Sequence, residues 1–272
     1  KMAFRLFEEK QHASVYQKFR FIPPEEVKTI ILDYLDRKKE KPHVLAVDLG
    51  CGTGQNTRLL APHFQEVVGL DVSESQLAEA RAVPGFSNIT YRAGSAEEMP
   101  FPDSSVDLIT AASAAHWFDA ERFLKEAHRV LKPQGCMALL GFASNIEFHY
   151  GNCEGRLTSI YRELEDALLP YTSQKVTMAN SMLQDLFEAI PYTDKERVGD
   201  IEMNIFRPVS SVVGFCESFS MYQAYQKAEP EAARALLQTT QQRFLEEMKV
   251  SSPETEVEVR MKYFCVLASK PR

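Results

Sequence analysis

A run of apolar residues ends in three glycines at alternate positions, within the stretch Val44–Asn56, VLAVDLGCGTGQN. The run predicts a buried strand, and the glycines predict a sharp turn from that strand into a helix. Three glycines without side chains also allow a ligand to approach the backbone closely, which makes Gly50, Gly52 and Gly54 candidate binding residues. An acid, Asp48, lies inside the end of the strand.

The spacing of the glycines separates classes of ligand. A dinucleotide-binding fold carries G-x-G-x-x-G, but counting from Gly52 the position of the third glycine holds Thr57. No G-K-[ST] sequence follows to hold a triphosphate. Asp48 would repel a pyrophosphate, whereas it would suit a ligand with a positive charge, such as an ammonium or a sulfonium group.

Strand-like and helix-like segments alternate after the glycine loop. Segments 66–72, 88–94, 106–113 and 136–142 resemble strands, and helices are expected from the Ser73 capping box to about Ala82 and over 120–131. Further strands are expected over 201–206 and 256–270, with helical patterns between 150 and 192 and between 208 and 248. The alternation predicts an α/β fold with a doubly wound seven-stranded sheet, mostly parallel with an antiparallel last strand.

The chain is expected to form a single domain over residues 1–272. We divide it into an N-terminal helical cap (1–40), a ligand-binding core (41–142), a helical insertion or lid (143–200), and the strands and helices that complete the sheet and lid (201–272). Ligands of such sheets bind at the carboxyl ends of the strands, which the insertion would cover.

Polar residues follow the ends of three other expected strands. Asp71 ends the second strand and suits two hydrogen bonds from vicinal ribose hydroxyls, although a turn or capping aspartate is an alternative. Ser95 and Glu97 follow the third strand and could recognise an adenine edge, with a simple turn as the rival interpretation. His116 and Trp117 follow the fourth strand, where they would lie over the mouth of the site; a structural histidine is an equal alternative.

Composition restricts the partners of the chain. The net charge is −7 and the pI about 5.5, which argues against broad binding to nucleic acids or anionic membranes. Five cysteines without a CxxC pair, and histidines without ligand spacing, predict neither a disulfide framework nor a metal site. The first residues carry no apolar run long enough for a signal peptide or a membrane span, so a cytoplasmic location is expected.

Four stretches together resemble the class I S-adenosylmethionine-dependent methyltransferases. VLAVDLGCGTG resembles motif I of that family and VVGLDVS its following acidic loop, and GSAEEMPFPDSSVDLIT and RVLKPQG complete the order across residues 44–142. The stretch from Tyr16 to Arg20 and the sequence AAHWFD further resemble the small-molecule branch that includes the trans-aconitate methyltransferases. The resemblance implies a Rossmann-like sheet and S-adenosyl-L-methionine as the cofactor.

The resemblance also implies a role for each part of the site. The glycines would line the homocysteine part of the cofactor, Asp71 would hold the ribose, and Arg20 could pair with the methionine carboxylate. The residues implied in cofactor binding are Tyr16, Arg20, Asp48, Gly50, Gly52, Gly54, Asp71, Val72, Ser95, Ala96, Glu97, Ala112 and Ser113.

The residues after the fourth strand bear on the methyl acceptor. A DPPY-type tetrad, which the resemblance associates with methylation of adenine or glutamine amides, is replaced by SAAHWF. This favours transfer to an oxygen, particularly of a carboxylate, which is a nucleophile at pH 7 without a base and reacts through proximity. For a hydroxyl or amine acceptor, His116 is the candidate base, with Trp117 beside it as a substrate-binding residue.

The sequence thus favours methyl transfer to a small molecule, without a membrane partner and with nucleic acid disfavoured. Three alternatives stay open: a catalytically weak, cofactor-binding regulatory protein, an NAD-dependent oxidoreductase, and an RNA methyltransferase. The oligomeric state is left open.

Overall fold

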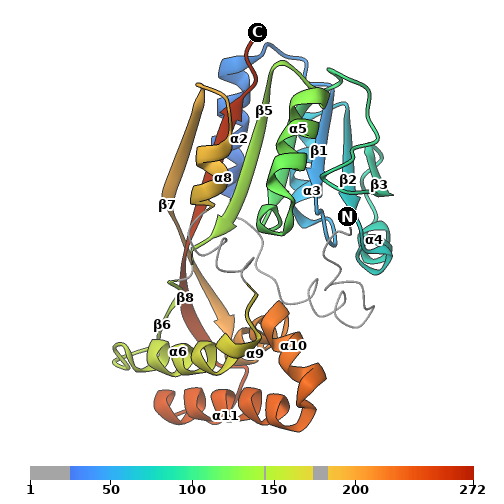
Figure 1. Ribbon diagram of the computed structural model, residues 1–272. Coiled ribbons are helices and arrows are strands. Elements are labelled where there is room, and N and C mark those ends of the chain that lie inside the picture. The colour runs from blue at the N-terminus through green and yellow to red at the C-terminus, as the bar shows by residue number, and fades with distance from the viewer. Residues whose placement is uncertain (1–24, 144, 174–182) are drawn as a thin grey trace.

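The computed structural model describes residues 25–143, 145–173 and 183–272, so Tyr16 and Arg20 lie outside the described residues. A single twisted sheet runs through the molecule (Figure 1), in the order β3-β2-β1-β4-β5-β8-β6, with β7 paired to β8. Its strands are β1 (Leu45–Leu49), β2 (Glu66–Asp71), β3 (Ile89–Ala93), β4 (Val106–Ala112), β5 (Leu131–Phe142), β6 (Glu147–His149), β7 (Lys195–Pro208) and β8 (Glu256–Ser269).

The first five strands are parallel, and the last strand, β8, is antiparallel to β5. The expected α/β fold is therefore confirmed, with one difference in the strand count. β5 and β6 follow one another along the same edge of β8, pairing with residues 263–269 and 258–260 respectively, while β7 pairs along the other edge. Four residues separate β5 from β6, but only two residues separate their partners on β8. The mismatch interrupts the pairing along this edge, so the edge carries two strands where the sequence predicts one.

Helices cover both faces of the sheet, because successive strand residues point to opposite sides. Ala46 of β1 and Leu108 of β4 belong to the apolar cluster that contains α2, whereas their neighbours Val47 and Ile109 belong to the cluster that contains α5. The helices are α2 (Glu25–Lys38), α3 (Gln55–Leu60), α4 (Glu74–Arg81), α5 (Ala120–Val130), α6 (Arg156–Leu168), α8 (Gln184–Ala189), α9 (Val209–Glu217), α10 (Ser220–Ala228) and α11 (Pro230–Met248).

Two helix starts follow the sequence closely. The Ser73 hydroxyl accepts a hydrogen bond from the Gln76 amide, as expected of a capping box, and α4 begins at the next residue. Asp119 caps α5 in the same way, since its side chain accepts from the Arg122 amide.

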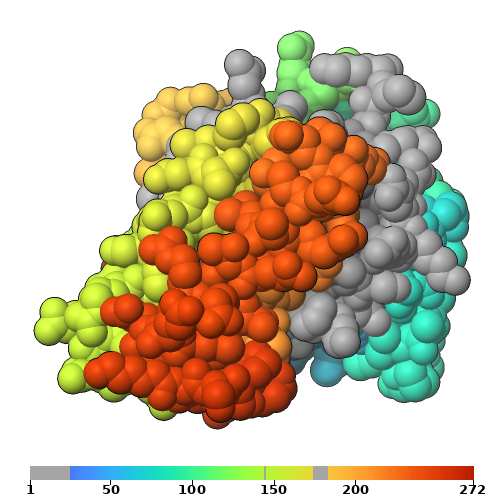
Figure 2. Space-filling model, turned by 90° about the horizontal axis from the view of Figure 1, so that it is seen from below, coloured from blue at the N-terminus to red at the C-terminus, as the bar shows by residue number. Residues whose placement is uncertain are grey.

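Four helices, α6, α9, α10 and α11, form a layer at the end of the sheet toward which β5 runs (Figure 1). We call these four helices the helical layer. Figure 2 shows it from below, with α6, α10 and α11 side by side. The segment 143–200, which the sequence marks as a helical insertion, contributes α6 to this layer and α8 elsewhere, and also contains β6 and the beginning of β7.

Asp107 stabilises the other end of the sheet, where the parallel strands begin. Its side chain is 1% exposed and accepts hydrogen bonds from the amides of Val44 (2.8 Å) and Leu45 (3.0 Å). The ammonium groups of Lys132 and Lys39 lie 3.2 and 3.6 Å from its other oxygen. Burial raises the pKa of Asp107, but the two amides and Lys132 outweigh burial, so the pKa lies below its usual value.

We expect Asp107→Asn to lower the free energy of unfolding at pH 7 by about 2–4 kcal/mol, because it removes a buried charge on which two amides and a lysine depend. The pKa is lower in the folded than in the unfolded chain. The stabilisation is therefore present above the unfolded value of about 4 and is lost as the pH falls through the folded value.

Urea unfolding at pH 7 and at successively lower pH measures this difference. Asp103→Asn is the matched control, since the Asp103 side chain is 80% exposed. Equal unfolding free energies for the two variants would contradict the assigned role of Asp107.

Candidate functional site

The glycine loop joins β1 to α3 in a backbone form that other residues rarely adopt. Gly50, Gly52 and Gly54 all have positive φ, at 59°, 57° and 86°. A Cβ on Gly50 would lie 2.7 Å from the Cβ of Ala114, and one on Gly54 would collide with the hydroxyl of Tyr91. Only glycine therefore fits at these two positions. Gly50 and Gly52 line a cleft, whereas Gly54 packs against β3 behind it.

Asp48 lies behind the loop rather than in the cleft. Its carboxylate is 1% exposed and accepts three hydrogen bonds: from Asn56 Nδ2 (3.0 Å), Thr57 Oγ1 (2.6 Å) and Thr110 Oγ1 (2.8 Å). Burial raises the pKa of Asp48 above its usual value, against the effect of these hydrogen bonds, and nearby Asp71 raises it further. The structure thus places the acid at the base of the loop, where it holds α3 and β4 together.

Asp71, at the end of β2, lines the cleft and also holds the loop. Its Oδ2 accepts from the Gly52 amide at 2.8 Å, and its Oδ1 accepts from the Ser73 amide at 2.9 Å. Each carboxylate oxygen can accept more than one hydrogen bond, so these bonds fix the carboxylate and leave acceptor capacity for a diol.

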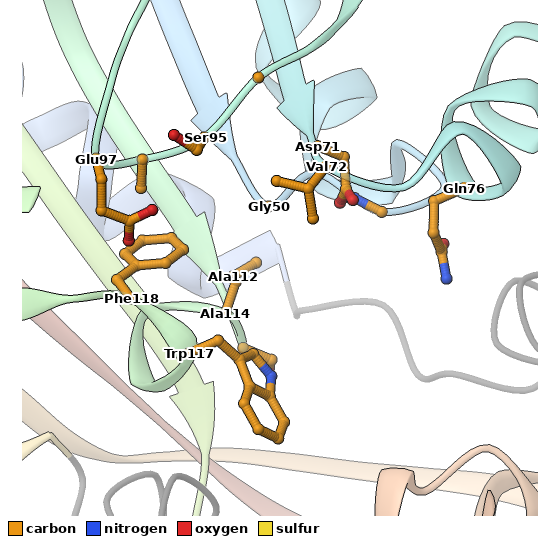
Figure 3. Close-up of a pocket in the computed structure, with 14 residues that line it drawn as sticks. Gly50, Asp71, Val72, Gln76, Ser95, Glu97, Ala112, Ala114, Trp117 and Phe118 are labelled. Atoms are coloured by element: carbon orange, nitrogen blue, oxygen red, sulfur yellow. The ribbon is translucent and has the colours of Figure 1, made fainter. Parts of the chain in front are cut away.

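The cleft opens at the carboxyl ends of β1, β2, β3 and β4 and holds about 720 Å³ of space, part of it continuous with solvent (Figure 3). Its described walls come from the glycine loop, the start of α4, the turn after β3 and the turn after β4. The lining residues are Gly50, Gly52, Asp71, Val72, Gln76, Gly94, Ser95, Ala96, Glu97, Ala112, Ser113, Ala114, Trp117 and Phe118.

The turn after β3 forms one end of the cleft, which is lined there by Ser95, Ala96 and Glu97. Glu97 also reaches the next turn, because its Oε2 accepts from the Asp119 amide at 2.9 Å. This bond fastens the turn after β3 to the beginning of α5.

The turn after β4 forms the neighbouring wall. Ala112 and Ser113 line the cleft, and Ser113 has a positive φ of 55°, a strained form for a residue with a side chain. Trp117 lines the cleft as well, as Figure 3 shows, but His116 does not. The His116 side chain is buried and its ring lies 4.6 Å from the ring of Trp117.

The sequence reasoning missed four of the lining residues: Gln76, Gly94, Ala114 and Phe118. Gln76 is the last residue of the capping box, a pattern that explains its place at the helix start and does not indicate the cleft. Phe118 follows Trp117 directly, and two adjacent aromatic residues after a strand are a signal for one apolar wall.

Charge and geometry together limit what the cleft can bind. Its described lining carries two carboxylates, Asp71 and Glu97, and no basic side chain, which suits a cationic guest and disfavours a pyrophosphate. Among residues 25–143, 145–173 and 183–272, no group of acidic, histidine and cysteine side chains could hold a metal ion. The same residues include no helix long and apolar enough to cross a membrane.

Gly50→Ala should weaken binding of S-adenosylhomocysteine, the product form of the expected cofactor, by about tenfold or more, because the added methyl group must displace Ala114 or the loop. Gly151→Ala is the matched control: Gly151 has a similar φ of 51°, but a Cβ there meets nothing within 4 Å. The control should show only the backbone cost of about 1–2 kcal/mol. Titration calorimetry and thermal unfolding measure both effects, and equal ligand affinities in the two variants would contradict the close packing assigned to Gly50.

Comparison with known proteins identifies what this part of the chain is similar to. The family described as a methyltransferase domain matches residues 47–139. A Dictyostelium discoideum protein named as a methyltransferase is 37% identical over 127 residues, which cover 47% of this chain and 46% of that protein. A Saccharomyces cerevisiae protein named as an S-adenosylmethionine-dependent methyltransferase is 27% identical over 178 residues, 60% of this chain and 56% of its own length.

The chain therefore spans about half the length of these curated relatives. A solved structure from Anaeromyxobacter dehalogenans, provisionally described as a type II methyltransferase, shares the fold with a TM-score of 0.73. It is 23% identical and covers 93% of this chain and 100% of that one. Residues 47–139 accordingly match a methyltransferase domain, and the relatives that share this part of the chain include one named for its dependence on S-adenosylmethionine.

Proposed function

We propose that the protein transfers a methyl group from S-adenosylmethionine to a small-molecule acceptor, with a carboxylate oxygen as the nucleophile. The observation that carries the proposal is the lining of the cleft. Of the described lining residues only Asp71 and Glu97 carry an ionisable side chain, and the carboxylate of each already accepts from at least one backbone amide. A carboxylate acceptor needs no base, so a cleft whose described lining offers no general base would be sufficient for methyl transfer to it.

The residues present fit the cofactor. Gly50 leaves room at the loop, Asp71 offers fixed acceptors for a ribose diol, and Val72 beside it suits packing against adenine. When bound, S-adenosylmethionine supplies a methyl group made electrophilic by a sulfonium. The chain would orient it, while Ala112, Ala114 and Trp117 exclude water from the side on which the acceptor approaches.

Asp48 contributes indirectly in this proposal. Its three internal hydrogen bonds fix the loop that would contact the homocysteine part. The roles of Tyr16 and Arg20, in closing the site over the methionine carboxylate, fall on residues outside the described part of the chain and stay predictions.

His116 would have a catalytic role only with a different acceptor. For a hydroxyl or amine acceptor we propose it as the general base, since it adjoins Trp117 in the cleft wall. For a carboxylate, its packing against Trp117 would matter only for the shape of that wall. The narrower resemblance to the trans-aconitate branch supports the carboxylate. The acidic net charge disfavours RNA as a substrate. A small molecule in the cytoplasm is accordingly the proposed partner, and a regulatory protein without turnover is the remaining alternative.

Asp71→Asn should raise the dissociation constant of S-adenosylhomocysteine by about 5- to 150-fold, which corresponds to the 1–3 kcal/mol of a lost hydrogen-bonding group. Glu74→Gln, an exposed acid on the adjoining helix, is the control matched in charge and should leave affinity unchanged. Titration calorimetry at constant salt provides the comparison. A variant Asp71→Asn that binds as tightly as the parent protein would remove Asp71 from the ribose site.

Labelled S-adenosylmethionine, incubated with a panel of small carboxylic acids, should give products that release methanol in mild alkali, as methyl esters do. His116→Gln should then keep kcat/KM within about threefold, and the rate should be flat between about pH 6 and 8, because no base is required. Alkali-stable products and a loss of about 100-fold or more in His116→Gln would instead assign a hydroxyl or amine acceptor with His116 as base. Tight cofactor binding without transfer to any metabolite fraction would favour the regulatory alternative.

A further inference from the structure

The turn after β3 is held from behind by two residues of α5. We call residues 94–99 the adenine-edge loop, because four of them line the proposed adenine end of the cleft. At its last residue, the Met99 amide donates to Glu126 Oε2 at 2.7 Å, and the Met99 carbonyl accepts from the Arg129 guanidinium at 2.9 Å. Neither Glu126 nor Arg129 belongs to the described lining of the cleft.

The Arg129 guanidinium uses all five of its N–H donors. Two bind the carboxylate of Glu126 (2.7 and 3.0 Å), one binds Asp103 (2.9 Å), and the other two bind the carbonyls of Met99 (2.9 Å) and Phe101 (2.8 Å). A lysine has three donors and no planar fork, so it cannot reproduce this set. The hydrogen bond from Arg129 lowers the pKa of Glu126, which keeps that carboxylate charged.

The adenine-edge loop meets α5 at both ends of the helix. Glu97 accepts from the Asp119 amide at the beginning of the helix, and Met99 is bound by Glu126 and Arg129 near its end. Between these points Ala96 and Met99 are buried in the same apolar cluster as Phe123 of α5. The position of the loop is therefore set by the helix behind it.

We propose that Arg129, oriented by Glu126, is a positioning residue that sets the adenine-edge loop and thereby the selectivity of the site for adenine over other purines. The inference rests on the proposed function, since it takes the adenine of the cofactor as the group that the loop contacts. Arg129 acts through the backbone of the loop and touches no ligand. A shifted loop would misplace backbone groups and Ser95 relative to the base edge, while the ribose contacts at Asp71 would stay in place.

Arg129→Lys tests the proposal, because it keeps the charge and the helix but cannot hold both carbonyls, Glu126 and Asp103 at once. Calorimetry with S-adenosylhomocysteine and with S-inosylhomocysteine, which carries an oxo group in place of the adenine amino group, gives two dissociation constants. We expect S-adenosylhomocysteine to bind about tenfold more weakly, and the inosine analogue to lose less than about threefold, so that selectivity falls. A merely structural role would weaken both ligands equally, and that result would overturn the proposal.

Arg122→Lys is the matched control, since Arg122 is an exposed arginine on the same helix. It should leave both dissociation constants unchanged. If Arg129→Lys does not fold, Glu126→Gln takes its place; it weakens the bond to the Met99 amide and should reduce selectivity in the same direction, whereas unchanged selectivity would count against the inference. Failure of the parent protein to bind S-adenosylhomocysteine would reject the proposed function itself, whereas binding by the parent with an unaltered ratio in the variants would reject only this inference.

Discussion

The buried carboxylate of Asp48 is the contact on which the glycine loop depends. An ionised carboxylate without water costs several kcal/mol unless donors replace that water, and here three donors from two other elements do so. Because Asn56 and Thr57 lie in α3 and Thr110 in β4, the acid fixes the angle at which the helix leaves the sheet. The glycines between Asp48 and Asn56 have positive φ values, which lets the chain turn sharply within this fixed geometry.

Around the cleft, other acidic side chains accept hydrogen bonds from backbone amides. Asp71 holds the glycine loop at Gly52, Glu97 holds the start of α5, and Glu126 holds the turn after β3. Each bond links segments that follow different strands, so the walls are fixed before a ligand arrives and less conformational entropy is lost on binding. A preorganised wall also serves a reaction whose rate depends on alignment more than on proton transfer.

Residue patterns predicted the parts of the fold that local physics determines. Apolar runs marked β1, β2 and β4, and the Ser73 capping box marked α4, because burial and capping act between near neighbours. The position of Asp48 behind the loop could not be predicted, since one of its partners, Thr110, lies 62 residues away. The division of one strand position into β5 and β6 depends likewise on the register against β8, a contact over more than 100 residues.

The part of the chain that lies outside the methyltransferase match bears on which acceptor the protein takes. The match to the methyltransferase domain ends at residue 139. The matched residues include the glycine loop, Asp71 and the turns that form the described cleft. The helical layer, built from later residues, lies at the end of the sheet toward which β5 runs (Figure 1). The described residues proposed to contact the cofactor fall within the matched part, and binding residues concentrate on segments held by a rigid scaffold. We therefore infer that acceptor choice belongs to the helical layer and to the turn bearing Trp117.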